Sequence, residues 1–310
     1  MSPMSSTQTN LHQSLCRSTS AVTNELSGRC GVQLLQRKKI MSESVLDLLF
    51  NPSKNQRPRR TLVYGVEGIG KSTIASQWPG VVFLPTEDGL RNIDCQSFHS
   101  PKSFKEMMDT LRAVAKLPSI PFGTLAIDTA DGVANLIDHD VKESHNEKEL
   151  SFGKDQLLCA DKWRELLNAL EWFNTSKQIG IVLLGHSHVE KFADPSGDSY
   201  DRFAPRLPKH SSAIVREWCD EVLFATYKVF RTETDEGFNR KRTIGVDGGR
   251  VLKTCEKPSH LAKNRLRLPD EIELSYATLS AYYPKAGDIA GMIKDGSSKK
   301  KNEQPAAAAS

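Results

Sequence analysis

A glycine-rich segment beginning at residue 65 has the residue types and spacing of a phosphate-binding loop. It follows the apolar run Leu62-Val63-Tyr64 and fits the pattern G-x-x-x-x-G-K-[ST] as Gly65-Val66-Glu67-Gly68-Ile69-Gly70-Lys71-Ser72. Glycines let backbone N–H groups close around a polyphosphate, the lysine reaches the β- and γ-phosphates, and the serine hydroxyl suits Mg²⁺. With Thr73 in a following helix whose N-terminus favours anions, the segment predicts a site for ATP and Mg²⁺. A purely structural glycine turn is the alternative.

Two acidic residues at the ends of later apolar runs are candidates to complete this site. Asp128 ends the run 124–127 and is predicted to hold Mg²⁺ through water, with Thr129 beside it orienting the same water shell. The alternative for Asp128 is a turn cap. Glu87 closes the run 81–84 and is predicted to position or deprotonate the attacking water, with the neighbouring Asp88 as the second choice.

The elements that must position these residues follow from short apolar runs. Strand-length runs occur at 61–64, 81–85, 124–128 and 179–184, and the first three lead into polar loops and helical periodicity. Amphipathic helices are predicted around 104–114 and 158–173. From 222 onward the sequence predicts antiparallel strands, with a turn at Asp247-Gly248-Gly249. These elements predict a three-layer α/β fold, with a mostly parallel sheet and C-terminal antiparallel edge strands.

Residues 189–212 read as a long polar loop in which aromatic rings alternate with cations. Stacking rings and basic groups suit single-stranded DNA. An ordinary surface excursion is the alternative. The loop carries Phe192 and Tyr200, and its candidate DNA-binding residues are Arg202, Phe203, Arg206 and Lys209.

The order of these features over residues 60–270 resembles phage-type RecA-like P-loop ATPases, a group linked to single-strand annealing and recombination. The resemblance implies that Glu87 is the catalytic glutamate. It also implies that His186, after the strand 181–184, senses the γ-phosphate where RecA itself has glutamine. A histidine bonded to nearby backbone is the alternative for His186, and a metal site of His186 and His188 lacks a third ligand at useful spacing.

The same resemblance extends to the basic segment 262–269, Ala-Lys-Asn-Arg-Leu-Arg-Leu-Pro. It implies that Lys263 and Arg265 act in trans on the nucleotide of a neighbouring subunit, and therefore that the protein is a homo-oligomer, either a ring or a filament. Solvated basic residues beside an edge strand are the alternative.

Composition sets the limits of the domain. The chain has 310 residues and a net charge of +4, and the segment 228–267 carries eleven basic and five acidic residues, which favours a polyanionic partner. Residues 1–42 are predicted to be a disordered leader, with a transit peptide or a true start at Met41 as alternatives, and 286–310 a disordered tail. The RecA-like domain is predicted over 43–285.

The rest of the composition bears on location. No apolar run is long enough to span a bilayer, so we expect no membrane association and a cytoplasmic location. Six cysteines without a C-x-x-C pair read as free thiols in a reducing compartment.

The sequence leaves two functions open. The first is an ATPase that binds single-stranded DNA and helps strands pair. The second is a nucleotide-binding regulator or scaffold with protein partners and little hydrolysis. A small-molecule kinase fits less well, because no arginine-bearing lid is recognisable.

Overall fold

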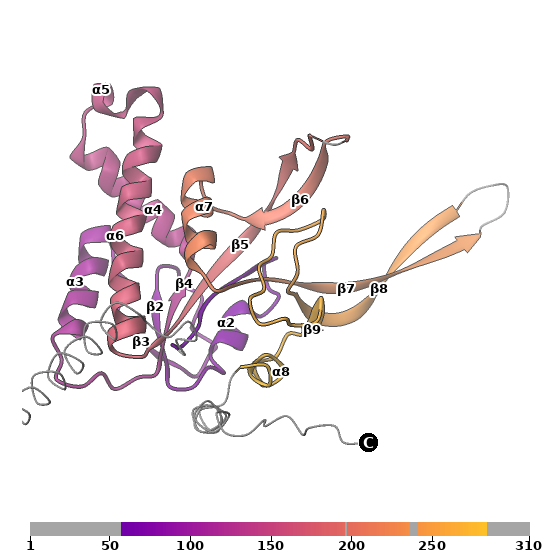
Figure 1. The fold of residues 1–310 in the computed structure, drawn as a ribbon, viewed down its shortest axis with the longest axis horizontal. Coiled ribbons are helices and arrows are strands. Elements are labelled where there is room, and N and C mark those ends of the chain that lie inside the picture. The colour runs from indigo at the N-terminus through magenta and orange to yellow at the C-terminus, as the bar shows by residue number, and fades with distance from the viewer. Residues whose placement is uncertain (1–56, 196, 236–240, 284–310) are drawn as a thin grey trace, which may run out of the picture. The chain divides into compact units, whose positions relative to one another are not determined.

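The computed structural model describes residues 57–195, 197–235 and 241–283 (Figure 1). These residues belong to one compact unit that begins at Arg57. The expected leader, 1–42, and the expected tail, 286–310, lie outside the described residues.

One mixed sheet forms the centre of the described residues, in the order β3-β2-β4-β5-β1-β7-β8-β9, with β6 paired to β5. Within the sheet, the neighbouring strands β3, β2, β4, β5, β1 and β7 pair in parallel. The remaining pairs, β7 with β8, β8 with β9 and β5 with β6, are antiparallel. The bounds of the strands are β1 Arg60–Gly65, β2 Val81–Pro85, β3 Gln96–Ser97, β4 Thr124–Asp128, β5 Gly180–Phe192, β6 Tyr200–Pro205, β7 Glu221–Asp235, β8 Lys241–Lys253 and β9 Glu271–Glu273.

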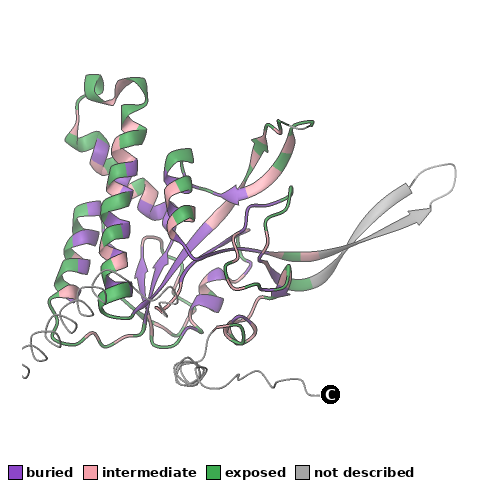
Figure 2. Cartoon of the chain, viewed as in Figure 1, coloured by how far each residue is buried: buried purple, intermediate pink, exposed green. Residues whose placement is uncertain are grey.

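Helices cover both faces of this sheet. Alternate side chains of β1 divide between two cores: Leu62 and Tyr64 pack with the larger helices, and Val63 packs with the smaller ones on the other face. The first face carries α3 Phe104–Ala115, α4 Ala130–Ser144, α6 Lys154–Ser176 and α7 Lys209–Trp218, and the second carries α2 Lys71–Ala75 and α8 Tyr276–Ser280. Short turns at α5 Glu147–Leu150 and η1 Ser151–Gly153 connect α4 to α6. Strands β1 and β4 are buried along their whole length, and β5 is buried as far as Gly185 (Figure 2). This sheet between two layers of helices confirms the predicted three-layer α/β fold.

Two local predictions were wrong. The segment 189–212 is not one loop: β5 continues to Phe192, pairs antiparallel with β6, and the chain then enters α7. Asp247-Gly248-Gly249 is not a turn, because it lies inside β8, where the pairing with β7 shifts register between Tyr227 and Val229. The part of β5 that pairs with β6 is half-buried or exposed, so it has no continuous apolar run that would identify it as a strand.

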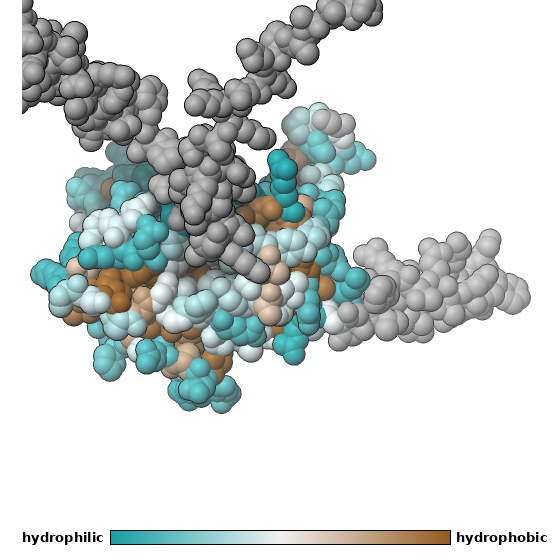
Figure 3. Space-filling model, turned by 60° about the horizontal axis from the view of Figure 1, so that its bottom comes forward, coloured by the Kyte–Doolittle hydropathy of each residue, from teal (hydrophilic) through white to brown (hydrophobic). Residues whose placement is uncertain are grey.

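The surface of the described residues varies in hydropathy. In the part of Figure 3 that grey atoms leave visible, hydrophobic patches are interspersed with hydrophilic ones. Among the described helices, none has the length and apolar character that crossing a bilayer requires. The four cysteines in the described ranges, Cys95, Cys159, Cys219 and Cys255, are all free thiols.

Candidate nucleotide-binding site

The glycine-rich loop joins β1 to α2 at the carboxyl edge of the parallel strands. Gly65, the last residue of β1, pairs with His186 of β5 on one side and with Ala225 of β7 on the other. A side chain at Gly65 would meet the Ala225 carbonyl oxygen at 2.2 Å, so only glycine lets these strands approach this closely. The loop therefore starts between two strands of the central sheet.

Lys71 directs its ammonium into this loop. The side chain is buried, and Nζ donates hydrogen bonds to the carbonyl oxygens of Gly65 at 3.2 Å and Val66 at 3.0 Å. Burial lowers the pKa of Lys71, and the negative charges of Asp128 and Asp131 oppose that effect. A phosphate group would provide the same kind of oxygen acceptor with a full negative charge.

Ser72 and Asp128 meet across the site. The Ser72 hydroxyl donates to Oδ2 of Asp128 at 2.6 Å, although the two residues lie on α2 and at the end of β4. Burial raises the pKa of Asp128, the Ser72 hydrogen bond lowers it, and the nearby Glu87 raises it further. A hydroxyl and a carboxylate are hard oxygen donors of the kind that Mg²⁺ prefers, and Mg²⁺ usually keeps several waters, so two protein ligands suffice. The donor set therefore fits Mg²⁺.

Glu87 is held beside Asp128 by two threonines. Thr129 donates from Oγ1 to Oε1 of Glu87 at 2.6 Å, and its backbone N–H donates to the Thr86 hydroxyl at 2.8 Å. Thr86 in turn donates to the Thr129 carbonyl at 2.8 Å. These bonds fix the ends of β2 and β4 to each other, so the carboxylates of Glu87 and Asp128 are positioned as one unit.

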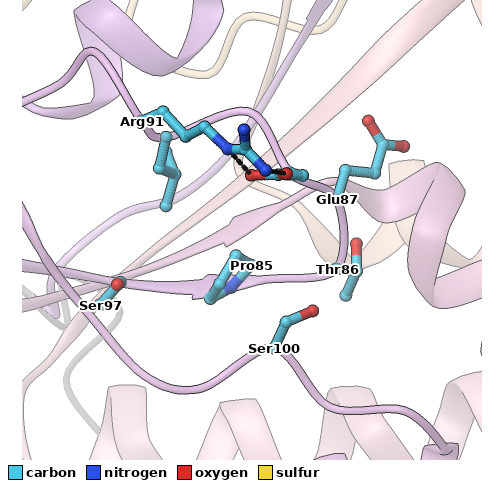
Figure 4. Close-up of a pocket in the computed structure, with 8 residues that line it drawn as sticks. Pro85, Thr86, Glu87, Arg91, Ser97 and Ser100 are labelled. Atoms are coloured by element: carbon cyan, nitrogen blue, oxygen red, sulfur yellow. Dashed lines mark hydrogen bonds and ion pairs between the residues drawn. The ribbon is translucent and has the colours of Figure 1, made fainter.

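An open pocket of about 420 Å³ lies next to Glu87. Figure 4 shows Thr86 and Glu87 at the end of β2, with Ser97 and Ser100 on the facing segment and Arg91 paired to Asp88. The second-choice base, Asp88, is therefore engaged by Arg91 Nε at 2.9 Å. Of the two acids, Glu87 is the one joined to the Asp128 side of the site.

His186 forms a cluster with Asp131 and Arg206. The His186 backbone N–H donates to Oδ2 of Asp131 at 2.8 Å, and the ring nitrogen Nδ1 lies 3.4 Å from the same oxygen. Arg206 donates from Nε to Oδ1 of Asp131 at 2.8 Å, and its Nη2 lies 3.2 Å from His186 Nδ1. Asp131 is buried and was not identified from the sequence, although its position three residues after Asp128, in the first turn of α4, was a usable signal.

The remaining DNA-binding candidates have different surroundings. Arg202 donates to Glu190 at 2.8 Å and lies 4.2 Å above the ring of Phe192. Phe203 stacks on Phe224 with ring centroids 5.0 Å apart and is half-buried, so its ring serves the core. Lys209 is exposed at the start of α7.

A groove of about 480 Å³ runs between the β5–β6 hairpin and α7. Among the described residues, neither Lys191 nor Lys209 has a hydrogen-bond or ion-pair partner. Glu190 is the one acid of the lining, and the basic lining residues are His188, Lys191, Arg202, Lys209 and Arg216. We call this the basic groove.

Lys263 and Arg265 lie away from the phosphate-binding loop. Lys263 donates from Nζ to the carbonyl oxygens of Arg216, Glu217 and Cys219, at 2.8, 2.8 and 2.6 Å, and so caps the C-terminal end of α7. Arg265 lies 3.2 Å from Asp220, which precedes β7 at the opposite end of the strands from the loop. The role that the structure shows for Lys263 is thus internal to the chain, and differs from the expected role in trans.

Comparison with known proteins identifies the family of the domain. Residues 57–266 match the family model described as AAA domain. No curated protein shows significant similarity to the chain. Among solved structures, the chain is similar to a RadB recombinase at 16% identity, with 70% of this chain and 86% of that chain covered and a TM-score of 0.39. With a phosphate-binding loop at the edge of a parallel sheet and a family match over most of its length, the chain belongs to the AAA domain family.

Proposed function

We propose that this protein hydrolyses ATP in a Mg²⁺-dependent reaction coupled to the binding of single-stranded DNA, in recombination or strand annealing. The observation that carries the hydrolysis is the bond from Thr129 to Glu87, because it fixes a carboxylate next to Asp128 and Ser72. A fixed base beside a metal-binding pair is what attack by water on a γ-phosphate needs.

Each residue of the site has a separate role in the proposed hydrolysis. Lys71 and the loop amides bind the phosphates and orient the γ-phosphorus toward the side of Glu87. Ser72 and Asp128 would hold Mg²⁺, which when bound neutralises charge on the phosphate oxygens. Glu87 accepts a proton from the attacking water, whose oxygen bonds to the γ-phosphorus while the bond to the ADP oxygen breaks. His186 lies beside Gly65 and can donate to a γ-phosphate oxygen.

The basic groove supports the DNA part of the proposal. Its unpaired lysines can pair with phosphodiesters, and β5 joins the groove directly to His186. Oligomer formation through the exposed side of Arg265 is also proposed. Sizing the protein with a non-hydrolysable ATP analogue would show assembly as an increase in mass, and a mass that stays that of one chain would refute it.

Steady-state turnover with and without a single-stranded oligonucleotide tests the function. We expect DNA-stimulated phosphate release that Lys71→Ala abolishes. If Lys71→Ala retains the wild-type rate, the nucleotide site is wrong. If wild-type turnover is normal but insensitive to DNA, and DNA binding does not depend on salt, the DNA part fails alone.

A further inference from the structure

Two side chains from the adjacent strands β7 and β8 lie on the side of the sheet that carries the phosphate-binding loop. Tyr227 of β7 pairs directly with Arg250 of β8, and the Arg250 carbonyl accepts from the N–H of Leu274, next to β9. Two residues earlier on β7 and two later on β8, Ala225 and Leu252 pack in the core on the α2 face. Because side chains two apart on a strand share a face, Tyr227 and Arg250 lie on the side of the sheet that carries the loop.

Arg250 reaches the loop itself. Its Nη1 donates to the carbonyl oxygen of Ile69 at 3.3 Å. A Cβ atom added to Gly70 would lie 3.0 Å from Nη1 and 3.9 Å from Leu274. The guanidinium therefore packs against the glycine just before Lys71, where φ is +101°. Among the described residues, no carboxylate pairs with Arg250, so this contact with the loop is not the by-product of an ion pair.

Tyr227 supplies a flat aromatic surface at the same place. Its side chain exposes 41% of its area, an unusual exposure for a large ring on a strand that is otherwise buried as far as Ala225. β8 and β9 pack in the same hydrophobic cluster as α2, the helix that follows the loop, through Leu252, Ile272 and Ile74. An aromatic ring and a planar guanidinium next to a phosphate cradle form a surface suited to a flat, polarisable group.

We propose that Tyr227 and Arg250 form the platform on which the base of the nucleoside triphosphate stacks. This inference rests on the proposed nucleotide site and extends it from the phosphates to the base. Stacking on a tyrosine ring and a guanidinium tolerates any purine, so the platform contributes affinity for the base and little discrimination between ATP and GTP.

Binding of two ligands by the full-length protein separates base from phosphate recognition. Calorimetry would compare Mg·ATP with magnesium inorganic triphosphate, which carries no base. We expect Tyr227→Ala to weaken ATP binding about tenfold, since aromatic stacking on a base has this order of effect, and to leave triphosphate binding unchanged. Tyr227→Phe retains the ring and should restore ATP affinity. Arg250→Gln should act in the same direction as Tyr227→Ala.

Tyr282→Ala is the matched control, because Tyr282 is a tyrosine of nearly equal exposure, 42%, and should leave both affinities at wild-type values. Equal losses of ATP and triphosphate binding in Tyr227→Ala would overturn the platform, and so would an unchanged ATP affinity. A wild-type protein that binds neither ligand would instead refute the nucleotide site, and this inference with it.

Discussion

The ion pair between Arg206 and Asp131, with Nε and Oδ1 2.8 Å apart, joins the end of the β5–β6 hairpin to the first turn of α4. Asp131 also accepts the backbone N–H of His186, so one buried carboxylate positions both the histidine and the arginine. We expect Arg206→Gln to lower ATP turnover about tenfold, because small displacements of catalytic groups cost this much or more. Mg·ATP affinity, measured by calorimetry, should change little.

The control is Lys209→Gln, which should leave turnover in the absence of DNA at the wild-type rate, because Lys209 is an exposed cation near the same hairpin without a partner among the described residues. If Arg206→Gln lowers DNA affinity and leaves the DNA-free turnover unchanged, Arg206 is a DNA contact and not a positioning residue.

Glu87→Gln should separate binding from chemistry. The amide keeps the shape of the side chain and can still accept from Thr129, but it cannot take a proton from water. We expect turnover to fall by about 10² or more, the usual contribution of a general base, with ATP affinity retained. Asp88→Asn removes the neighbouring acid and should leave the rate within about twofold of wild type. Unchanged turnover in Glu87→Gln would show that Glu87 is not the base; if Lys71→Ala also abolished the capture of protein partners, the regulator or scaffold function would be favoured.

Glu221 should make stability depend on pH. It is completely buried, and burial raises its pKa to about 7, although the charge of Arg59 and a hydrogen bond from Thr61 lower it. The folded state therefore holds this proton more tightly than the unfolded state does. Between the unfolded pKa, near 4.5, and about 7, the free energy of unfolding should fall as pH rises, by roughly 1–3 kcal/mol from this group.

Chemical denaturation of Glu221→Gln at pH 5 and pH 8 would test this. The amide cannot ionise, so the variant should gain stability relative to wild type on going from pH 5 to pH 8. Glu217→Gln, an exposed carboxylate, should give no such difference. Parallel pH dependence in wild type and Glu221→Gln would contradict the buried proton.

Lys263 should matter for stability and not for chemistry. Its ammonium donates hydrogen bonds to three carbonyl oxygens at the end of α7, and these oxygens lose that donor when the side chain is removed. We expect Lys263→Ala to lower the free energy of unfolding by about 1–2 kcal/mol, and Lys257→Ala, which breaks an exposed pair with Asp270, to have no measurable effect. A stable Lys263→Ala protein that assembles but has lost turnover would restore the role in trans.

The basic groove should show a characteristic salt dependence. Each lysine that contacts a phosphate contributes about one unit to the slope of log affinity against log salt. Lys191→Gln and Lys209→Gln should each reduce that slope by about one for a single-stranded oligonucleotide. Lys102→Gln, on the loop before α3, should not. An unchanged slope in both groove variants would place DNA elsewhere.

The sequence predicted those parts of the site that consist of a strand and the residues directly at its end. The loop after β1, the acid after β2 and the acid that ends β4 follow from short apolar runs that end in polar residues, and parallel strands bring those ends together. Contacts between distant residues were not accessible in this way. Asp131 and Arg206 are 75 positions apart, and their pairing depends on a hairpin that had been interpreted as a loop.

The surroundings of basic residues were also hard to predict from the sequence. In the sequence, a cation in a charged segment looks the same whether it faces a polyanion or a helix end. The structure shows Lys263 bonded to the end of α7, and its role in trans stays a prediction. Thr129 was placed at the site from the sequence, as the neighbour of Asp128. Its hydrogen bond to Glu87 could not be predicted, because it depends on the register in which β2 and β4 pair.

Strand β5 runs without interruption from Gly180 to Phe192, so His186 and the hairpin share one continuous backbone. The six steps from His186 to Phe192 span about 20 Å at the usual rise of a strand. Strand β5 pairs with β4 as far as Leu184 and with β1 as far as His186, and from Ser187 onward it pairs with β6. A change in the tilt of β5 near the nucleotide would therefore move the β5–β6 hairpin as a rigid body, without any segment having to fold or unfold.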